Sequence, residues 1–128
     1  MGAITILSEN DLLKKAALPL QKTKEVAWRG LKVTVKNCLP LQEYLALTDR
    51  ILKDASDGNG NILYELLDFS LRVNIIATYL FVDLPKDAQK LYDIVYRTDL
   101  YDLVINSVDT DQVHQLLKAI NLYAGIKE

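Results

Sequence analysis

The stretch KEVAWRGLKVTVK, residues 24–36, decides the fold class of this chain. Apolar side chains recur at every second position on both sides of a central Arg29-Gly30 pair. A period of two with β-branched residues is typical of a half-buried strand, and glycine tolerates the positive φ of a two-residue turn. The stretch therefore predicts a β-hairpin. Its polar side chains are expected to face outward: Lys24, Lys32, Thr34 and Lys36.

From Pro40 onward the apolar spacing changes to three and four residues, which indicates helices. Residues 63–82 are almost wholly apolar after Ser70, and a helix that is apolar on all sides lies at the centre of its fold. Thr98-Asp99 and Asp109-Thr110-Asp111 precede two later helices as caps. We predict an α+β fold, mostly α. An N-terminal helical arm and the hairpin should pack on a bundle of about five helices around the buried helix 63–82.

At 128 residues the chain has the usual size of one domain with one core. Residues 1–22 are expected to form an arm with a short helix, which begins after Ser8 and ends before Pro19. Residues 23–128 are expected to be a single domain, with the hairpin at 24–36 and the helical body at 40–125. The arm helix is too short to be stable alone in water, so it must dock on the body or on another molecule.

Charge is distributed unevenly along the chain. The whole carries a net charge of −2 and a pI near 5.4, which argues against a generally basic nucleic-acid binder. Residues 14–36 nevertheless hold seven basic side chains and one acid, a balance of +6, whereas residues 37–128 balance at −6. Two interpretations stay open: the lysines solvate an exposed arm and hairpin, or the two parts present opposite potentials to protein partners.

Three features of the sequence are candidates for a reaction centre. Residues 57–62 echo a calcium loop, but its first and twelfth positions fall on Ala55 and Leu66, so a plain Asx-Gly turn is expected. His114 is the only histidine and Cys38 the only cysteine, and Cys38 is expected to be a buried small hydrophobe. We predict no catalytic, cofactor-binding or metal-binding residues, no cofactor, and no enzymatic activity.

Aromatic residues gather in the second half of the chain. Tyr92 and Tyr96 are four residues apart and therefore share one helix face. One interpretation is core packing with the hydroxyls at the rim, and the other is a patch for a protein partner, because tyrosine brings large contact area at low entropic cost.

Several segments carry a resemblance to a known group of proteins. Residues 26–36, followed by 39–43, resemble uncharacterised small proteins in the virion-morphogenesis regions of tailed phages and prophages of Gram-positive bacteria. Residues 67–72, 84–92 and 96–99 fit the same picture. The layout of a hairpin before helices is also similar to tail-assembly chaperones of long-tailed phages. The arm lies outside the resemblance.

The resemblance implies a non-catalytic bacteriophage virion structural or assembly protein that acts through protein–protein contacts. It would be a capsid, neck or tail component, or a tail-assembly chaperone, found in the host cytoplasm during assembly and in the virion if it is retained. The open alternative is a phage-encoded inhibitor of a host defence protein or enzyme.

The expected partners are other phage structural proteins or further copies of this chain, and nucleic acid is not expected. No membrane contact is expected either, because the longest uncharged apolar stretch, residues 73–82, is about half of a membrane span. A hairpin edge offers unpaired backbone groups to a partner's strand. The predicted partner-binding residues are Lys14, Lys15, Trp28, Arg29, Lys32, Thr34 and Lys36.

Overall fold

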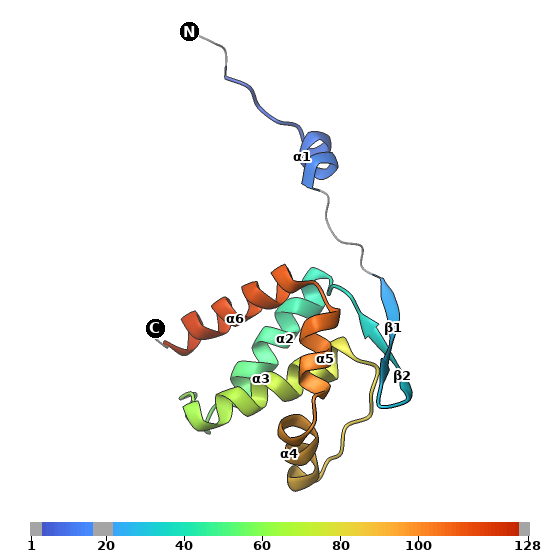
Figure 1. The fold of residues 1–128 in the computed structure, drawn as a ribbon. Coiled ribbons are helices and arrows are strands. Elements are labelled where there is room, and N and C mark those ends of the chain that lie inside the picture. The colour runs from blue at the N-terminus through green and yellow to red at the C-terminus, as the bar shows by residue number, and fades with distance from the viewer. Residues whose placement is uncertain (1–3, 17–21, 126–128) are drawn as a thin grey trace.

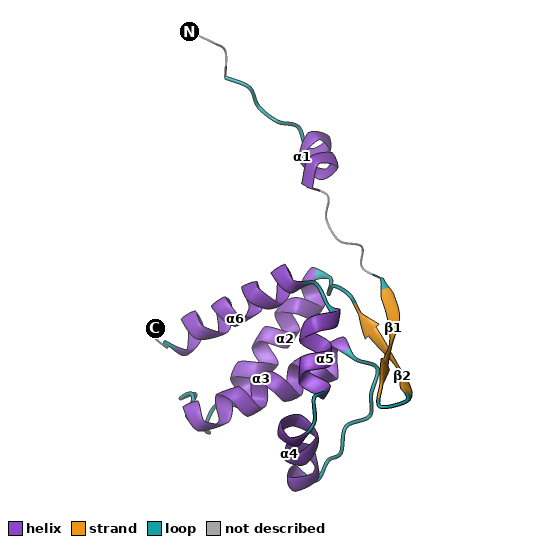
Figure 2. Ribbon diagram, in the orientation of Figure 1, coloured by secondary structure: helices purple, strands orange, loops and turns teal. Residues whose placement is uncertain are grey.

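The computed structural model describes residues 4–16 and 22–125 and has an α+β, mostly helical fold. Figures 1 and 2 show an antiparallel hairpin on one side of a helical body. In chain order the described elements are α1 (Glu9–Ala16), β1 (Thr23–Trp28), β2 (Leu31–Lys36), α2 (Leu41–Asp54), α3 (Tyr64–Tyr79), α4 (Ala88–Arg97), α5 (Leu100–Ser107) and α6 (Thr110–Ala124). The predicted end of the arm helix at Pro19 lies outside the described residues.

The hairpin forms where the alternation predicts it. Val26 pairs with Val33 and Trp28 with Leu31, so the two strands join through Arg29-Gly30 alone. Both turn residues have positive φ, 50° and 82°, which matches the right-handed twist of the strands. The hairpin prediction is confirmed.

One of the four side chains predicted to face outward is on the other face. Lys24 pairs with Val35 and has the same parity as Val26, so it stands on the inner face at the open end of the hairpin, where it is exposed. Lys32, Thr34 and Lys36 do lie on the outer face, together with Glu25 and Ala27.

The central helix is shorter than predicted, because α3 ends at Tyr79. Leu80 takes an extended conformation with φ −106° and ψ 147° and forms a β-bridge with Val35. Phe81 then donates its backbone N–H to the carbonyl oxygen of Thr34 at 3.0 Å. This pairing gives hydrogen-bond partners to backbone groups on the outer edge of β2. If the helix continued, those groups would lack these partners.

The core is built around the second half of α3, which contacts α2, α4 and α5. Its N-terminal turns are largely exposed, so only this second half behaves as the predicted buried helix. Burying an aliphatic or aromatic side chain contributes about 1.5–3 kcal/mol, and several elements supply such residues. The fully buried side chains include Val35, Leu47, Ile51, Ile75, Ile76, Tyr79, Val104, Leu116 and Ile120.

Polar residues of α3 bind α2 instead of interrupting the core. Asn74 donates to a carboxylate oxygen of Asp54 at 3.1 Å, and Arg50 donates to the hydroxyl of Thr78 at 2.8 Å. Buried polar groups are costly only without a hydrogen-bond partner, so these pairs fix how α2 and α3 align at little cost.

The segment after β2 is fastened to α6. Asp109 donates its backbone N–H to the carbonyl oxygen of Asn37 at 2.8 Å. The amide of Gln112 accepts from the N–H of Leu39 at 2.8 Å and donates to the carbonyl oxygen of Leu39 at 2.9 Å. The hydroxyl of Tyr79 donates to the same amide oxygen at 2.7 Å. These bonds hold the hairpin, α3 and α6 together.

Candidate interaction surfaces

The turn of the hairpin is bound to the start of α5. The indole N–H of Trp28 donates to Oδ1 of Asp99 at 2.8 Å, and Arg29 lies 3.5 Å from the same oxygen. The Arg29 guanidinium also lies over the Trp28 ring, 5.3 Å from its centroid. The hydrogen bond from Trp28 holds the pKa of Asp99 below its ordinary value, with help from the charge of Arg29. Two predicted partner-binding residues, Trp28 and Arg29, are thus engaged within the chain.

The sequence predicts that Thr98 and Asp99 cap α5, and in the structure only Thr98 bonds the start of the helix with its side chain. Asp99 does occupy the N-cap position, but its carboxylate makes no cap hydrogen bond. The N–H of Leu100 bonds the hydroxyl of Thr98 at 3.3 Å instead, which leaves the carboxylate for Trp28 and Arg29.

The outer face of the hairpin carries the other three predicted hairpin residues. Lys36 is half-buried, lies 3.0 Å from a carboxylate oxygen of Glu43, and sits over the Phe81 ring at 5.4 Å from its centroid. Thr34 is half-buried, whereas Lys32 is exposed and forms no ion pair with any residue that the structure describes. Among the described residues of the outer face, Lys32 is therefore the cation that is free to meet a partner.

The free edge of the hairpin is β1. Leu80 and Phe81 already pair with β2, and β1 has no second strand partner within residues 4–16 and 22–125. The register turns the backbone N–H and C=O groups of alternate β1 residues, Thr23, Glu25 and Ala27, away from β2. All three residues are exposed, so this edge can accept an added strand.

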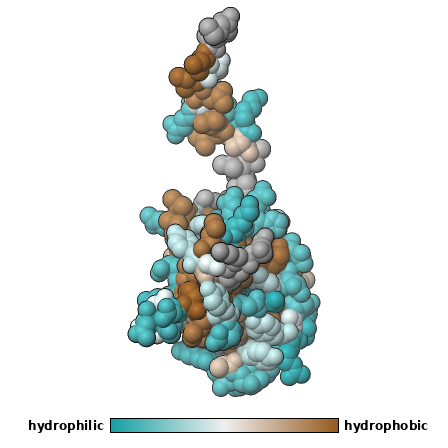
Figure 3. All heavy atoms as spheres, turned by 90° about the vertical axis from the view of Figure 1, so that its left-hand side faces the viewer, coloured by the Kyte–Doolittle hydropathy of each residue, from teal (hydrophilic) through white to brown (hydrophobic). Residues whose placement is uncertain are grey.

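The arm is a second exposed surface. Ser8 caps α1 by accepting from the N–H of Asp11 at 3.1 Å, and Asp11 accepts from the N–H of Ser8 at 3.2 Å. These two bonds also lower the pKa of Asp11 below its ordinary value. Yet α1 buries none of its residues, and Figure 3 shows brown apolar side chains along the arm, away from the body. The exposed large apolar residues here are Ile4, Ile6, Leu7, Leu12 and Leu13.

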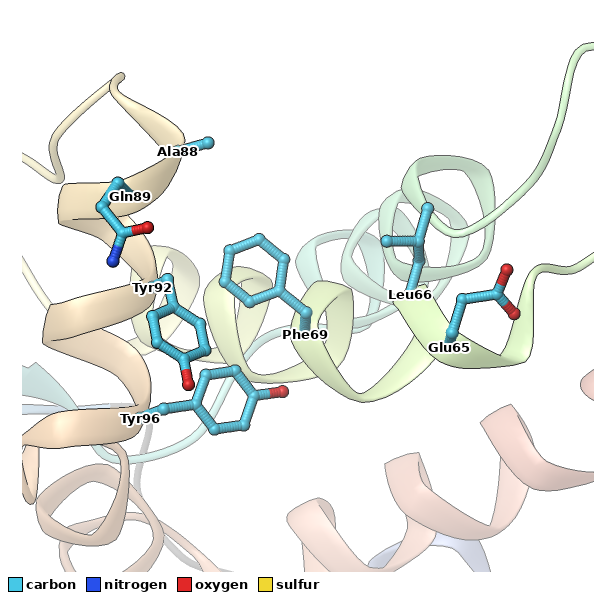
Figure 4. Close-up of a pocket in the computed structure, with 7 residues that line it drawn as sticks. All are labelled: Glu65, Leu66, Phe69, Ala88, Gln89, Tyr92 and Tyr96. Atoms are coloured by element: carbon cyan, nitrogen blue, oxygen red, sulfur yellow. The ribbon is translucent and has the colours of Figure 1, made fainter.

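A third surface is an aromatic groove between α3 and α4, with a cavity volume of about 420 Å³. Figure 4 shows Tyr92 and Tyr96 of α4 turned toward Phe69 of α3, with Leu66 and Glu65 farther along α3. The Tyr96 ring lies 6.0 Å from the Phe69 ring and 5.3 Å from the Tyr92 ring, centroid to centroid. Tyr92 is 47% exposed, so the core interpretation fails for it and its ring is available to a partner.

Charged groups fix the geometry of the groove. The hydroxyl of Tyr96 donates to Oδ2 of Asp68 at 2.6 Å, and Nε of Arg72 donates to the same oxygen at 3.0 Å. The Arg72 guanidinium is also sandwiched between the rings of Tyr96 and Tyr101, at 5.0 and 4.7 Å from their centroids. Partial burial and the bond to Asp68 raise the pKa of Tyr96 to about 12, so its hydroxyl remains a donor at neutral pH.

Sequence analysis found only the tyrosine half of this groove. The sequence places Leu66 and Phe69, three residues apart on α3, within the predicted central helix 63–82. Asp68 and Arg72 lie beside them and are four residues apart, a spacing at which opposite charges pair on a helix surface. This pair in the sequence indicates that this turn of α3 reaches the surface.

The three candidate reaction centres are the loop at residues 57–62, Cys38 and His114. Oδ1 of Asp57 accepts from the N–H groups of Asn59 and Asn61 at 2.8 and 3.0 Å, which confirms the Asx turn. Cys38 is half-buried rather than buried, and its Sγ lies 3.9 Å from Asp109. Burial and the nearby carboxylate raise the pKa of this thiol. His114 is exposed, and the described residues contain no group of three or more His, Cys, Asp or Glu placed to hold a metal ion.

Comparison with known proteins adds no relative: no family model matches the chain, nor does any curated protein or solved structure. None of the described helices has both the length and the apolar character that crossing a membrane requires.

Proposed function

We propose that this protein is a non-catalytic assembly protein that acts through protein–protein contacts, as a structural or assembly component of a bacteriophage particle. The observation that carries the contact role is the arm: α1 buries no residue, and the large apolar side chains that the structure describes in the arm are exposed. A two-turn helix with such a surface gains stable order only by packing on something else. The phage assignment rests on the resemblance of residues 24–124.

The hairpin is the second contact element in this proposal. A partner strand would pair with the edge of β1, and Lys32 beside it would meet the partner's acidic groups. Lys14 and Lys15 would do the same on the arm. Trp28, Arg29, Thr34 and Lys36 would contribute contact area, while their internal bonds keep the hairpin rigid.

The test combines light scattering on the purified protein with mass spectrometry of intact particles from the same lysate. A protein that is present in the particle, or that is held by another particle protein during assembly, supports the proposal. A species that is absent from both, and that binds a host enzyme or defence protein instead, would overturn it in favour of an inhibitor.

A charge reversal identifies the surface. Lys32→Glu should weaken the complex with the particle partner and leave the melting temperature of the isolated protein nearly unchanged, because Lys32 has no ion pair to lose among the described residues. Lys118→Glu, an exposed lysine of α6, is the matched control. Equal weakening by both variants would reject the hairpin as the contact site. Lys36 is unsuitable here, because its reversal would also break the pair with Glu43.

A further inference from the structure

We propose that α1 of one copy binds in the α3–α4 groove of a second copy, which joins the chains head to tail. This inference deepens the proposed function, because it names one partner of the arm as another molecule of the same protein. It depends on features of the two surfaces and on where they lie in the fold.

The groove is suited to receive an apolar helix. Its lining includes Phe69, Leu66 and the exposed ring of Tyr92. The groove is open and has a volume of about 420 Å³. Because two helices form the walls, a third helix can lie between them with its side chains in the gap.

The arm offers side chains that fit such a groove. Leu12 and Leu13 are 54% and 59% exposed, and Ala16 is one turn after Leu12 on the same face of α1. Withdrawing two leucines from water favours docking, and the groove supplies the packing that this helix lacks on its own.

The last turn of α1 and the groove carry opposite charges, although the first turn of α1 is acidic. Lys14 and Lys15 directly follow the two leucines in the last turn of α1. Glu65 is exposed at the groove and makes no hydrogen bond or ion pair within the described part of the chain, whereas the carboxylate of Asp68 already binds Arg72 and Tyr96. Glu65 is therefore the group that the arm lysines would meet.

The position of the groove favours a second copy over the arm of the same chain. The bond between Trp28 and Asp99 places the hairpin turn near the junction of α4 and α5. β1 begins at the opposite, open end of the hairpin (Figure 1). The six residue steps from Ala16 to Lys22 span at most about 20 Å, and a six-residue strand is itself about 20 Å long. The segment between α1 and β1 is therefore about as long as the hairpin itself. A chain that ran back along the hairpin would use all of this length before it reached the far side of α4.

Cysteine cross-linking tests this arrangement directly. In a Cys38→Ala background, protein carrying Leu13→Cys is mixed with protein carrying Tyr92→Cys and oxidised. We expect a disulfide-linked heterodimer at several times the yield of a matched mixture of Leu13→Cys with Leu122→Cys, an exposed leucine of α6. The doubly substituted Leu13→Cys/Tyr92→Cys chain should give a ladder of linked oligomers. Equal yields in the two mixtures, or a product that is only the internally linked monomer, would overturn the inference.

A charge exchange provides the second readout. Lys14→Glu/Lys15→Glu should raise the dissociation constant of self-association about tenfold or more, and adding Glu65→Lys to the same chain should restore much of it. Unchanged circular dichroism shows that each variant is folded. No rescue by Glu65→Lys, or a native protein that is monomeric at every concentration, would overturn the inference. If the protein is monomeric but still enters particles, the inference fails and the proposed function holds. If it is oligomeric but absent from assembly and from particles, the inference holds and the proposed function fails.

Discussion

At the scale of single residues, Asp99 joins the hairpin to the helical body through one carboxylate oxygen. That oxygen accepts from Trp28 at 2.8 Å and lies 3.5 Å from Arg29. The carboxylate is on the surface, so screening by water limits what the ion pair contributes, and the hydrogen bond is the main interaction. The sequence marks Asp99 as a helix cap, since nothing local distinguishes a carboxylate that binds its own helix from one that binds a strand 71 residues away.

This contact makes stability depend on pH in a predictable direction. The pKa of Asp99 is lower in the folded protein, so its contribution is complete above the unfolded value of about 3.9 and is lost as the pH falls through the lower folded pKa. We expect the native protein to exceed Asp99→Asn in stability at neutral pH, and the difference to shrink below about pH 4. Urea unfolding followed by the fluorescence of the only tryptophan, Trp28, measures it. A difference that is the same at both pH values would contradict this account.

Gln112 is a polar residue whose loss should weaken the fold, because one side chain satisfies several groups. Its amide satisfies the N–H and C=O of Leu39 and the hydroxyl of Tyr79. Gln112→Ala leaves these groups without partners, and we expect the free energy of unfolding to fall by about 2–3 kcal/mol. Gln115→Ala, an exposed position on the same helix, should change it by less than about 0.5 kcal/mol. Urea titration of both variants checks the contrast, and equal midpoints would refute the role of Gln112.

At the scale of elements, the hairpin turn depends on backbone conformation more than on side-chain contacts. Gly30 has φ +82°, and a Cβ added there would meet nothing within 4 Å, so only backbone strain opposes a side chain. We expect Gly30→Ala to lower the free energy of unfolding by about 1–2 kcal/mol.

Gly58→Ala is the control for this prediction. A Cβ added at Gly58 would also meet nothing within 4 Å, but Gly58 does not have a positive φ in the left-handed range. Its substitution should be neutral or slightly stabilising, because alanine has fewer unfolded conformations than glycine. Thermal or urea unfolding of Gly30→Ala and Gly58→Ala distinguishes the cost of backbone strain from the cost of a steric clash. Equal effects of the two substitutions would show that the turn tolerates a side chain.

The boundaries of elements depended on tertiary pairing. Helical spacing predicted that the central helix would run to residue 82, but α3 ends at Tyr79 because Leu80 and Phe81 pair with β2. A long apolar run has the same composition in a helix and in an extended segment beside a sheet, so periodicity alone cannot place this boundary. The C-terminal stop of α6 was local and predictable, since Gly125 takes the left-handed conformation with φ 72°.

At the scale of the whole molecule, positive and negative charge are divided between two parts of the chain. Residues 14–36 carry a balance of +6, and residues 37–128 carry a balance of −6. Such a distribution steers unlike surfaces together over distances that salt shortens.

Self-association should therefore weaken as sodium chloride rises from about 0.1 M to about 1 M, because the screening length falls from about 10 Å to about 3 Å. Sedimentation equilibrium at several salt concentrations measures the dissociation constant, for which we expect a several-fold increase. Lys14→Glu/Lys15→Glu should reduce this dependence. Association that strengthens with salt would indicate apolar contacts alone.

The sequence by itself determined the hairpin, its turn, the Asx loop and the approximate extents of the helices, because each depends on a period, a cap or a glycine that acts within a few residues. Only the tertiary structure decided which polar groups are engaged and which surfaces are bare. In the structure Trp28 bonds Asp99 and Lys36 pairs with Glu43. Lys32 and the described part of the arm are exposed, and a groove lies beside Phe69. These contacts join residues that are far apart in the sequence, so they depend on how the helices pack. A local sequence pattern carries no information about that packing.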